Sequence, residues 1–584
     1  MRTSPRSPAR TSAPAWATPP SGSASSGAFP LPEPGPKLLA SPETSDRERR
    51  FLWFPLVGSV FAGIGLRLWN LLGQVLGGDE LHAVRAAVAR TVPEILTTYS
   101  VADSSLPLTA LYRWLLDHGA TLSELAFRAP SILCGALALV VIPYSFAGRV
   151  PRQAVLVSAW LGAISPDLVL YSRIARSYLP MLLSGFIAVM AFEAWWRTRS
   201  WKSGLTYVLC GALAVWIHLG AAPFVVAPIL FALGDLFTRR GERWERLRGL
   251  AVLGMALALA CAAFLLPARA SLERLVAKKS VEQSVPLSTV WDVLRLQAGT
   301  PSHTVAVLFW IGALAGLVLL VRDRPRFGLF TLTIAAGHLL GLRILSPLGL
   351  DHPLLLNRYM LPVLPFVLLW VAHALGRLWT RKAGGCTGFV AQRYATRLLL
   401  LLLFWTGPFL SPGYRDGSFM HHNDFVDFVH PRATLPDNLV PAVYRDLPRG
   451  PVLEAPWPTV WDQGRVFYIY QEIHDRRVLV SAPFDLPRHR GIDFRNEVPP
   501  EPRALLESPA RTLIVHLRLP WEEDRVQAPG RPPARPMRLD VRQAYRRAGE
   551  RLAAQLVEAS GPPDKTDGFV RVWDLERVRR AQLQ

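Results

Sequence analysis

The sequence predicts a polytopic α-helical membrane protein with a small α/β or α+β domain at its C-terminus. Half of the 584 residues are hydrophobic, and the mean hydropathy is positive, at +0.22. The apolar residues fall in runs of about 17 to 25, long enough to cross a hydrocarbon core of roughly 30 Å as a helix. The loops between these runs alternate between strongly basic and weakly charged, as expected for loops on opposite sides of a membrane.

The apolar runs define about eleven predicted transmembrane helices within a domain of residues 49–412. The preceding residues, 1–48, are rich in Pro, Ser and Ala and are predicted to form a disordered cytoplasmic tail. One boundary has an alternative, because the two short spans on either side of His218 could form a single long broken helix. The predicted spans lie at about 51–72, 130–149, 153–172, 178–196, 205–219, 221–237, 249–268, 303–321, 327–345, 357–377 and 396–412.

Basic residues set the predicted orientation of the chain. With the N-terminus in the cytoplasm, every loop on that side is rich in Arg or Lys. This distribution accounts for the net charge of +21, so we expect the lipid bilayer and not a nucleic acid as the partner. The odd number of spans places the C-terminal domain, residues 413–584, outside the cytoplasm. The sequence thus predicts a multi-pass protein of the cell (inner) membrane with an extracytoplasmic, or periplasmic, C-terminal domain.

Two regions outside the spans have recognisable patterns. The first outer loop, residues 73–129, has apolar residues at helical spacing over 80–90 and 106–116, which predicts amphipathic helices lying in the membrane interface. The C-terminal domain contains a helical stretch at 538–558 and several short runs rich in β-branched and aromatic residues. These runs predict strands near 452–454, 466–470, 477–480, 512–516 and 569–573.

An acidic pair, Asp79-Glu80, directly follows the first span. Charges at this position are costly unless they line a polar cavity or bind a ligand, which makes the pair a candidate catalytic site. One carboxylate could act as a general base on an acceptor hydroxyl, while the other orients the acceptor or helps to hold a divalent metal ion. The alternative is that Asp79, after two glycines, simply caps the following helix.

Arginines at the outer ends of later spans are candidate anion ligands. Arg173 and Arg176 are three residues apart after the third span, and Arg358 opens the tenth. Guanidinium groups can grip a phosphate with two hydrogen bonds, although arginines at span ends more often reach toward lipid headgroups. Asp167, deeper in the third span, could pair with one of these arginines. His218, at the end of the fifth span, is by itself more often a packing residue than a ligand.

Taken together, these elements resemble the GT-C membrane glycosyltransferases. The resemblance covers roughly residues 51–412, and the nearest groups are the protein O-mannosyltransferases and the lipid A aminoarabinose transferases. It rests on the Asp79-Glu80 pair in the first outer loop, the S-R-x-x-R-x-Y element from 172 to 178, the His-Gly element at His218, and the R-Y-x-x-P-x-x-P element from 358 to 365. The C-terminal Tyr-x-Tyr-Gln-x-x-His run at 468–474 also resembles the tails of some bacterial members.

The resemblance implies a sugar donor carried on a polyprenyl phosphate and a lipid, glycan or protein acceptor. Asp79 would be the base, with Glu80 beside it. Arg173, Arg176 and Arg358 would bind the donor phosphate, and a single displacement would invert the anomeric carbon. Tyr178, His218 and Tyr359 would contact the substrate.

Two departures from the family bear on the sugar and the acceptor. The first outer loop has Ser-Ser-Leu-Pro-Leu at 104–108, where many members have a His-Pro-Pro-Leu-Tyr-like segment. Asp167 is an acid where members often have none. The competing hypotheses are a lipid-linked sugar transporter or flippase and a non-catalytic cell-envelope scaffold. A transporter should carry polar residues along its spans, whereas the ionisable residues here gather at the span ends.

Overall fold

The computed structural model describes the chain in segments. The described residues are 46–69, 71, 80, 83, 86–87, 90–99, 105–118, 124–238, 240–279, 284–380, 386–407, 442–448, 452–455, 478–479, 502–506, 510–518 and 539–583. The chain divides into two units, Met1–Ala40 and Ser41–Gln584, and all described residues belong to the second. Most of the predicted N-terminal tail therefore lies outside the described residues.

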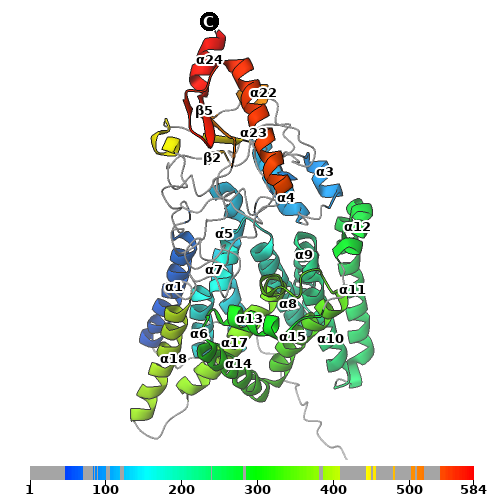
Figure 1. Ribbon diagram of the computed structural model, residues 1–584. Coiled ribbons are helices and arrows are strands. Elements are labelled where there is room, and N and C mark those ends of the chain that lie inside the picture. The colour runs from blue at the N-terminus through cyan, green and yellow to red at the C-terminus, as the bar shows by residue number, and fades with distance from the viewer. Residues whose placement is uncertain are drawn as a thin grey trace, which may run out of the picture. The chain divides into compact units, whose positions relative to one another are not determined.

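Thirteen helices of the described residues follow the predicted spans (Figure 1). They are α1 (Asp46–Leu68), α5 (Glu124–Phe146), α6 (Arg152–Ile164), α7 (Pro166–Ser172), α8 (Tyr178–Thr198), α9 (Trp201–Ile217), α10 (Ala222–Leu236), α11 (Arg243–Leu265), α14 (His303–Asp323), α15 (Pro325–Leu345), α16 (Pro353–Met360), α17 (Leu364–Thr380) and α18 (Cys386–Thr406).

These helices confirm the predicted fold class. Within the described part, 7 helices are long and apolar enough to cross a membrane, and the bent pair of α6 and α7 would make an eighth. Three shorter apolar helices, Phe54–Leu68, Trp201–Ile217 and Thr396–Thr406, lie at the three remaining predicted positions. Each predicted span therefore coincides with an apolar helix, although these three are shorter than a usual membrane-spanning helix.

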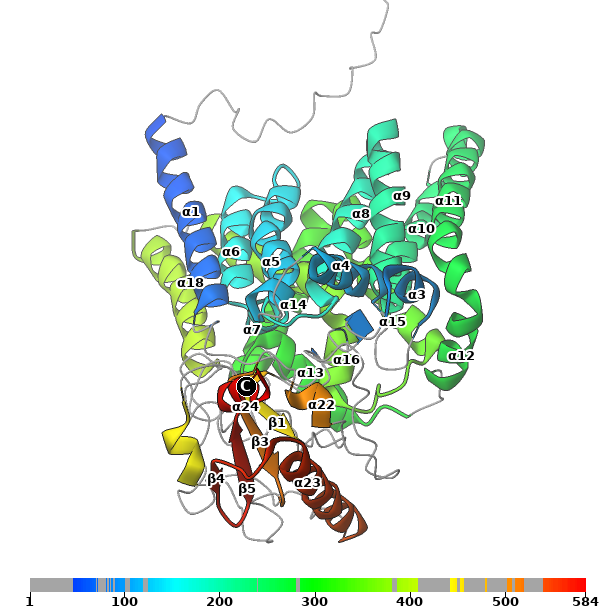
Figure 2. The same ribbon diagram turned by 90° about the horizontal axis from the view of Figure 1, so that it is seen from above.

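Helix α17 forms the centre of the bundle, and α11 lies at its margin. The apolar segment Pro353–Arg377 is 94% buried, whereas that of Arg243–Ala277 is only 17% buried. The backbone of α14 approaches α17 closely at Gly316, where an added Cβ would collide with the carbonyl of Trp370. Figure 2 shows α1 and α11 at opposite margins of the bundle. An apolar surface left uncovered by protein, as on α11, suits contact with lipid.

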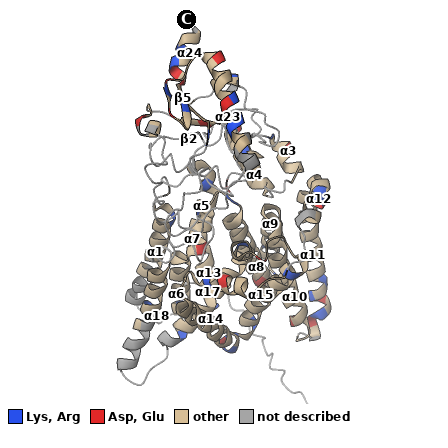
Figure 3. Cartoon of the chain, viewed as in Figure 1, with Lys and Arg blue, Asp and Glu red and all other residues tan. Residues whose placement is uncertain are grey.

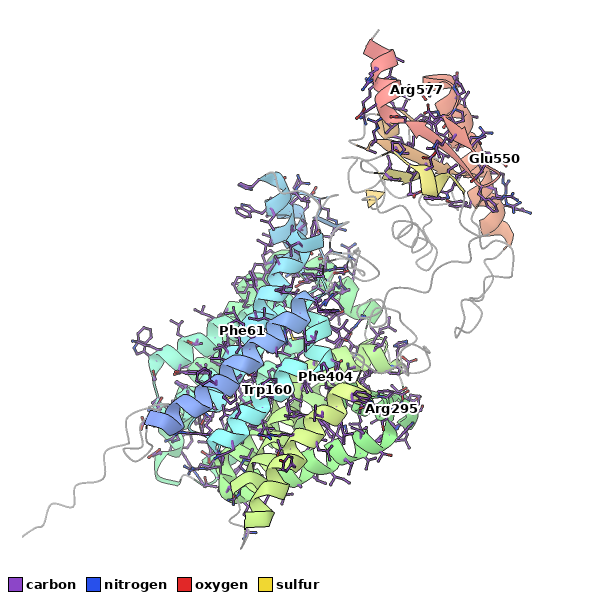
Figure 4. The ribbon with its side chains drawn as sticks, turned by 90° about the vertical axis from the view of Figure 1, so that its left-hand side faces the viewer. Phe61, Trp160, Arg295, Phe404, Glu550 and Arg577 are labelled. Atoms are coloured by element: carbon purple, nitrogen blue, oxygen red, sulfur yellow. The ribbon has the colours of Figure 1, made fainter. Side chains whose placement is uncertain are left out.

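Helix α6 packs against both the first helix, α1, and the last apolar helix, α18. Its residue Trp160 lies between these two helices in Figure 4. A Cβ at Gly58 of α1 would be in ordinary contact with the Trp160 ring, at 3.6 Å. Figure 3 shows that the Lys, Arg, Asp and Glu positions of the apolar helices lie mostly toward the helix ends. The middle of the bundle is therefore largely apolar, as the hydropathy predicts.

Proline residues break two of the predicted spans. Pro166 lacks a backbone N–H and restricts Ser165 to an extended conformation, with φ −61° and ψ 117°. The third span is consequently two helices, α6 and α7, which are bent by 55°. In the tenth span, Pro362 and Pro365 flank a 3₁₀ turn, Leu361–Val363, between α16 and α17. Because of these breaks, α7 and α16 are short helices that are separate from the longer helices α6 and α17.

The two short spans around His218 are separate helices. His218 has extended backbone angles, φ −154° and ψ 114°, which end α9. A 3₁₀ turn, Leu219–Ala221, then leads into α10, and α10 packs against α9. The structure thus supports two helices here and not the single broken helix that the sequence allowed.

The predicted outer loops contain more helix than expected. Helix α11 continues through the 3₁₀ turn Leu266–Ala268 into α12 (Arg269–Lys279), and α13 (Leu287–Ala298) follows. The predicted loop over 269–302 is therefore largely helical. The first loop contains α3 (Val92–Thr97) and α4 (Leu106–Asp117), which confirms its second predicted helix. At positions 80, 83, 86 and 87 of the first predicted helix, the backbone is also helical.

The first loop is attached to the extension of α11. The backbone N–H of Tyr99 donates to Ser271 Oγ of α12 at 2.9 Å. Tyr99, Leu106, Ala268 and Leu275 form a small apolar cluster between these segments. Burial in this cluster raises the pKa of Tyr99 to about 12, so its hydroxyl stays neutral.

The C-terminal part forms a mixed five-stranded sheet in the order β2-β1-β3-β5-β4. The strands are β1 (Val452–Ala455), β2 (Val478–Leu479), β3 (Thr512–His516), β4 (Lys565–Thr566) and β5 (Val570–Asp574), and the helices are α22 (Pro502–Leu506), α23 (Leu539–Ser560) and α24 (Leu575–Leu583). Pairs β1/β2 and β1/β3 are parallel, whereas β3/β5 and β4/β5 are antiparallel. The predicted strand at 466–470 lies outside the described residues. The α/β character and four of the five predicted strands are confirmed.

Candidate functional site

The turn between α7 and α8, residues 173–177, carries the two arginines of the S-R-x-x-R-x-Y element. The backbone N–H of Ala175, in the middle of this turn, donates to Glu80 Oε1 at 2.7 Å. Arg128 of α5 donates to the same carboxylate through Nε, at 2.9 Å to Oε1, and through Nη2, at 2.8 Å to Oε2. Glu80 therefore links its position in the first loop to a turn 95 residues further along the chain.

The Glu80–Arg128 pair is fully enclosed. Glu80 is 4% exposed and Arg128 is 0% exposed. A buried carboxylate and guanidinium compensate for lost hydration only when their geometry is good and their remaining groups are bonded, and the two parallel hydrogen bonds supply this geometry. This arrangement gives Glu80 a positioning role. The groups that contact its carboxylate from Arg128 and Ala175 are hydrogen-bond donors, which suit an anion.

The other member of the acidic pair, Asp79, lies outside the described residues. A divalent metal ion was one expectation for this region. Within the described segments, no group of three or more His, Cys, Asp or Glu side chains is placed to hold a metal ion. The sequence offers one further candidate metal pair, His421-His422 followed by Asp424 and Asp427, whose spacing matches no defined metal site and which also lies outside the described residues.

Arg173 is buried and bonded to the end of α1. Its guanidinium is 0% exposed. Nη1 donates to the carbonyl of Leu66 at 3.3 Å and to the carbonyl of Trp69. The carbonyls at the end of a helix have no partner within the helix and carry partial negative charge. An arginine there donates hydrogen bonds to these carbonyls and also compensates their charge. Arg173 consequently holds α1 against the turn that follows α7.

A second group of predicted residues forms an aromatic and cationic cluster. The Tyr178 ring lies 5.8 Å from the His218 ring, which in turn lies 6.1 Å from the Tyr359 ring. The guanidinium of Arg358 lies over the Tyr178 ring, 5.4 Å from its centroid, a favourable cation–π distance. Tyr171 of α7 adds a fourth ring, 5.1 Å from Tyr178. The cluster thus brings together α7, α8, α16 and the end of α9.

Backbone features hold this cluster in place. His218 Nδ1 accepts a hydrogen bond from the N–H of Gly220 at 3.1 Å. A Cβ at Gly220 would lie 2.9 Å from the His218 ring and 3.2 Å from Tyr359, so only glycine fits between them. His338 of α15 contacts the carbonyl oxygen of Tyr359 through Nε2 at 2.7 Å. The His-Gly element is therefore required by packing at the site.

The predicted phosphate ligands differ in their access to solvent. Arg176 and Arg358 are partly exposed, as are His218 and Tyr359, whereas Arg173 is buried. A side chain must be reachable to meet a ligand. Arg176 and Arg358 are consequently the better placed of the three arginines for a ligand. Arg173 instead holds the turn 173–177 against the end of α1.

Among the described residues, Asp167 forms no ion pair with an arginine, although the sequence allowed one. It lies in the first turn of α7, and its Oδ1 accepts a hydrogen bond from Asn357 Nδ2 of α16 at 3.0 Å. The two residues are 190 positions apart in the sequence. This contact connects α7 and α16, the two short helices that carry Tyr171 and Arg358.

Sequence reasoning missed four residues that the structure brings to this region. They are Arg128, Tyr171, Asn357 and Arg67, whose Nε donates to Ser172 Oγ at 3.0 Å. A signal was available for the two arginines, because Arg67 and Arg128 each interrupt an apolar run. A charge in such a position has a specific partner as a rule. Tyr171 and Asn357 carry no comparable signal, since both suit many positions at a membrane surface.

Comparison with protein-family models finds no match, and comparison with curated proteins finds none either. The solved structures that are similar to this chain include these two. ArnT from Cupriavidus metallidurans in the apo state has 13% identity and a TM-score of 0.47, over 80% of this chain and 93% of that chain. The Archaeoglobus fulgidus oligosaccharyltransferase in complex with Zn and sulfate has 14% identity and a TM-score of 0.42, over 80% of this chain and 68% of that chain.

Likenesses of this size identify neither a substrate nor a reaction, so we base the function on the side chains of the site. Fold and site together define a polytopic helical membrane protein. Its site of arginine, tyrosine and histidine side chains lies where α7, α9 and α16 end and where α8 begins.

Proposed function

We propose that this protein is a membrane glycosyltransferase. It would move a sugar from a polyprenyl-phosphate donor to an acceptor hydroxyl on the extracytoplasmic face, with the N-terminus in the cytoplasm. The observation that carries this proposal is the set of hydrogen bonds around Glu80. Through Arg128 and the N–H of Ala175, these bonds hold Glu80 of the first loop against the arginine-bearing turn after α7. This contact supports a base and an anion site that lie close together, as transfer from a phosphate donor requires.

Arg176 and Arg358 are the proposed ligands of the donor phosphate. Both are partly exposed, and Arg358 is oriented by the Tyr178 ring beneath it. A guanidinium suits a phosphate because its planar N–H groups can donate two parallel hydrogen bonds. Tyr178, His218 and Tyr359 surround this position and are the proposed contacts of the sugar phosphate. A donor with a polyprenyl chain would be met in the bilayer, which explains a site at the ends of apolar helices.

Asp79 is the proposed general base. It would take the proton of the acceptor hydroxyl while the acceptor oxygen forms a bond to the anomeric carbon. The bond from that carbon to the phosphate oxygen would break, and the arginines would stabilise the charge that develops on the phosphate. A single displacement of this kind inverts the anomeric carbon. Glu80 would position the loop and leave its neighbour to do the chemistry.

The test is sugar transfer from labelled polyprenyl-phosphate sugars in membranes that contain the full chain. We expect Asp79→Asn to abolish turnover while donor binding, measured separately, is retained. Asp117→Asn is the matched control, because Asp117 lies in the same loop and is paired with Arg113 on the surface of α4. Its turnover should be close to native.

Other outcomes would redirect the assignment. Donor binding without turnover in the native chain, across a range of sugars and acceptors, would favour a transporter of lipid-linked sugars or a scaffold. Full turnover in Asp79→Asn would remove Asp79 as the base. A covalent sugar trapped on Asp79 or Glu80 would contradict the single displacement.

A further inference from the structure

Asp167 and Asn357 meet inside the protein with one hydrogen bond and two unsatisfied oxygens. Each side chain is 1% exposed. Asn357 Nδ2 donates to Asp167 Oδ1 at 3.0 Å. The second oxygen of each group, Asp167 Oδ2 and Asn357 Oδ1, is also buried, and neither receives a hydrogen bond from any residue that the structure describes. Two buried acceptors without a donor are costly, since each loses its bonds to water.

An ionised carboxylate does not suit this position. A buried charge needs a partner of opposite charge or several hydrogen bonds, and Asp167 forms no ion pair with the basic side chains of the described segments. Two titratable groups lie close to the pair in the described chain: Tyr171, one turn further along α7, and Arg358, next to Asn357. Arg358 interacts with Tyr171 and lies over the Tyr178 ring, so its charge is directed toward the site.

We propose that Asp167 is protonated and forms a cyclic acid–amide pair with Asn357. In this pair the Asn357 N–H donates to Asp167 Oδ1, and the Asp167 Oδ2–H donates to Asn357 Oδ1. A carboxylic acid and a carboxamide present complementary edges, each with one donor and one acceptor. A single proton on Asp167 therefore satisfies both buried oxygens and removes the buried charge.

The acid–amide pair would act as a positioning device for the site. Both residues lie on short helices that begin at prolines, Pro166 and Pro353, and each helix also carries a residue of the site, Tyr171 or Arg358. Two hydrogen bonds between α7 and α16 fix the distance and the rotation of these helices. The existence of the pair does not depend on the proposed function; its role for Arg358 in phosphate binding does.

The protonation state can be measured by infrared spectroscopy of the full chain with isotopically labelled aspartate. The carbonyl stretch of a protonated carboxylic acid is separate from the carboxylate and amide bands. We expect the native protein at neutral pH to show one such band that Asp167→Asn removes. Asp351→Asn, in the exposed loop before α16, should leave the band in place. Absence of the band in the native protein, or its persistence in Asp167→Asn, would overturn the proposal and favour a cation held between the two oxygens.

An exchange of the two side chains gives a second test. Asn357→Asp alone places two carboxyl groups against each other and should lower the apparent melting temperature clearly. The double variant Asp167→Asn with Asn357→Asp restores one acid and one amide, so it should recover most of the loss and regain the infrared band. Failure of the double variant to recover either property would contradict the paired arrangement. Neither readout requires enzymatic activity, so a failed glycosyltransferase assignment would not affect the result.

Discussion

Glu80 and Arg128 form a buried ion pair between residues 48 positions apart, with hydrogen bonds of 2.9 and 2.8 Å. The same carboxylate accepts the backbone N–H of Ala175 at 2.7 Å. One side chain thus ties together the first loop, α5 and the turn between α7 and α8. The acidic pair of the sequence consequently divides into two roles. Glu80 sets the position of the loop, and its neighbour Asp79 is the proposed base.

The first prediction concerns Glu80→Gln. Removing one partner of a buried ion pair leaves the other charge without compensation, at a cost of about 3 to 5 kcal/mol. We expect a marked fall in the apparent melting temperature of the purified protein, with loss of activity as a consequence of unfolding or loop displacement. Glu273→Gln on the exposed face of α12 is the control and should change little. A native melting temperature in Glu80→Gln would show that the pair does not support the fold.

The second prediction concerns close packing between α5 and α7 at Gly135. A Cβ there would lie 2.2 Å from Ser172 Oγ and 3.2 Å from Arg67 Nε. Gly135→Ala should therefore destabilise the protein by about 1 to 3 kcal/mol, as overpacking usually does. Gly254→Ala in α11 is the matched control, because nothing lies within 4 Å of its added Cβ. Alanine favours a helix over glycine, so the control should be neutral or slightly stabilising.

Thermal unfolding of both glycine variants in the same detergent checks this prediction. Equal melting temperatures for Gly135→Ala and Gly254→Ala would mean that α5 and α7 do not approach as closely as described. A loss confined to Gly135→Ala would also support the Arg67–Ser172 hydrogen bond, which lies directly beside the added methyl group.

Sequence patterns predicted the helices well, because hydropathy reports directly on which segments enter a membrane. Every predicted span coincides with an apolar helix of the structure. The bend at Pro166 was accessible in principle, since proline removes an N–H and restricts the residue before it. The helical loop over 269–302 was not expected, because its mixed composition shows no long apolar run. The continuation of α11 through Leu266–Ala268 into α12 is accompanied by contacts with the first loop, which are distant in sequence.

The candidate site was predicted in part. The cluster of Tyr178, His218, Arg358 and Tyr359 was found through motif resemblance and is brought together by the structure. The partners that support it were not found. Arg128 and Asn357 lie far along the chain from Glu80 and Asp167, and no local pattern links residues so distant in sequence. The sequence also did not predict that Arg173 is buried while Arg176 is partly exposed, because both belong to one motif.

The third prediction is a pH dependence in the first loop. The backbone N–H of Thr91 donates to Glu94 Oε2 at 2.8 Å, and this bond, followed by the Thr91 side chain, holds the pKa of Glu94 below its usual range. A lowered pKa in the folded state means that the stabilising contribution is present above the ordinary glutamate pKa. It is lost as the pH falls through the lowered value. We expect the start of α3 to loosen only at acidic pH, by a small amount, because Glu94 is exposed.

The titration of Glu94 can be followed by carbon NMR with labelled glutamate. Thr91→Ala keeps the backbone N–H, so the midpoint should stay below the ordinary glutamate range, although it should rise from the native value. Glu94→Gln removes this titration and assigns the signal. An ordinary midpoint in the native chain would show that the hydrogen bond does not form in solution.

The fourth prediction separates Arg358 from Arg173. Arg358→Lys keeps the positive charge but loses the planar group that lies over Tyr178 and can grip a phosphate twice. A hydrogen bond to a charged group contributes about 1.5 to 3 kcal/mol, so we expect donor affinity and kcat/KM to fall roughly ten- to hundred-fold. The melting temperature should stay close to native, because the side chain is partly exposed.

Arg173→Lys should show the opposite pattern, since its buried guanidinium bonds the carbonyls of Leu66 and Trp69. Its main effect should be lower thermal stability. Donor binding measured beside thermal unfolding distinguishes the two variants. Unchanged donor binding in Arg358→Lys, with a specific loss in a stable Arg173→Lys protein, would transfer the phosphate contact to Arg173.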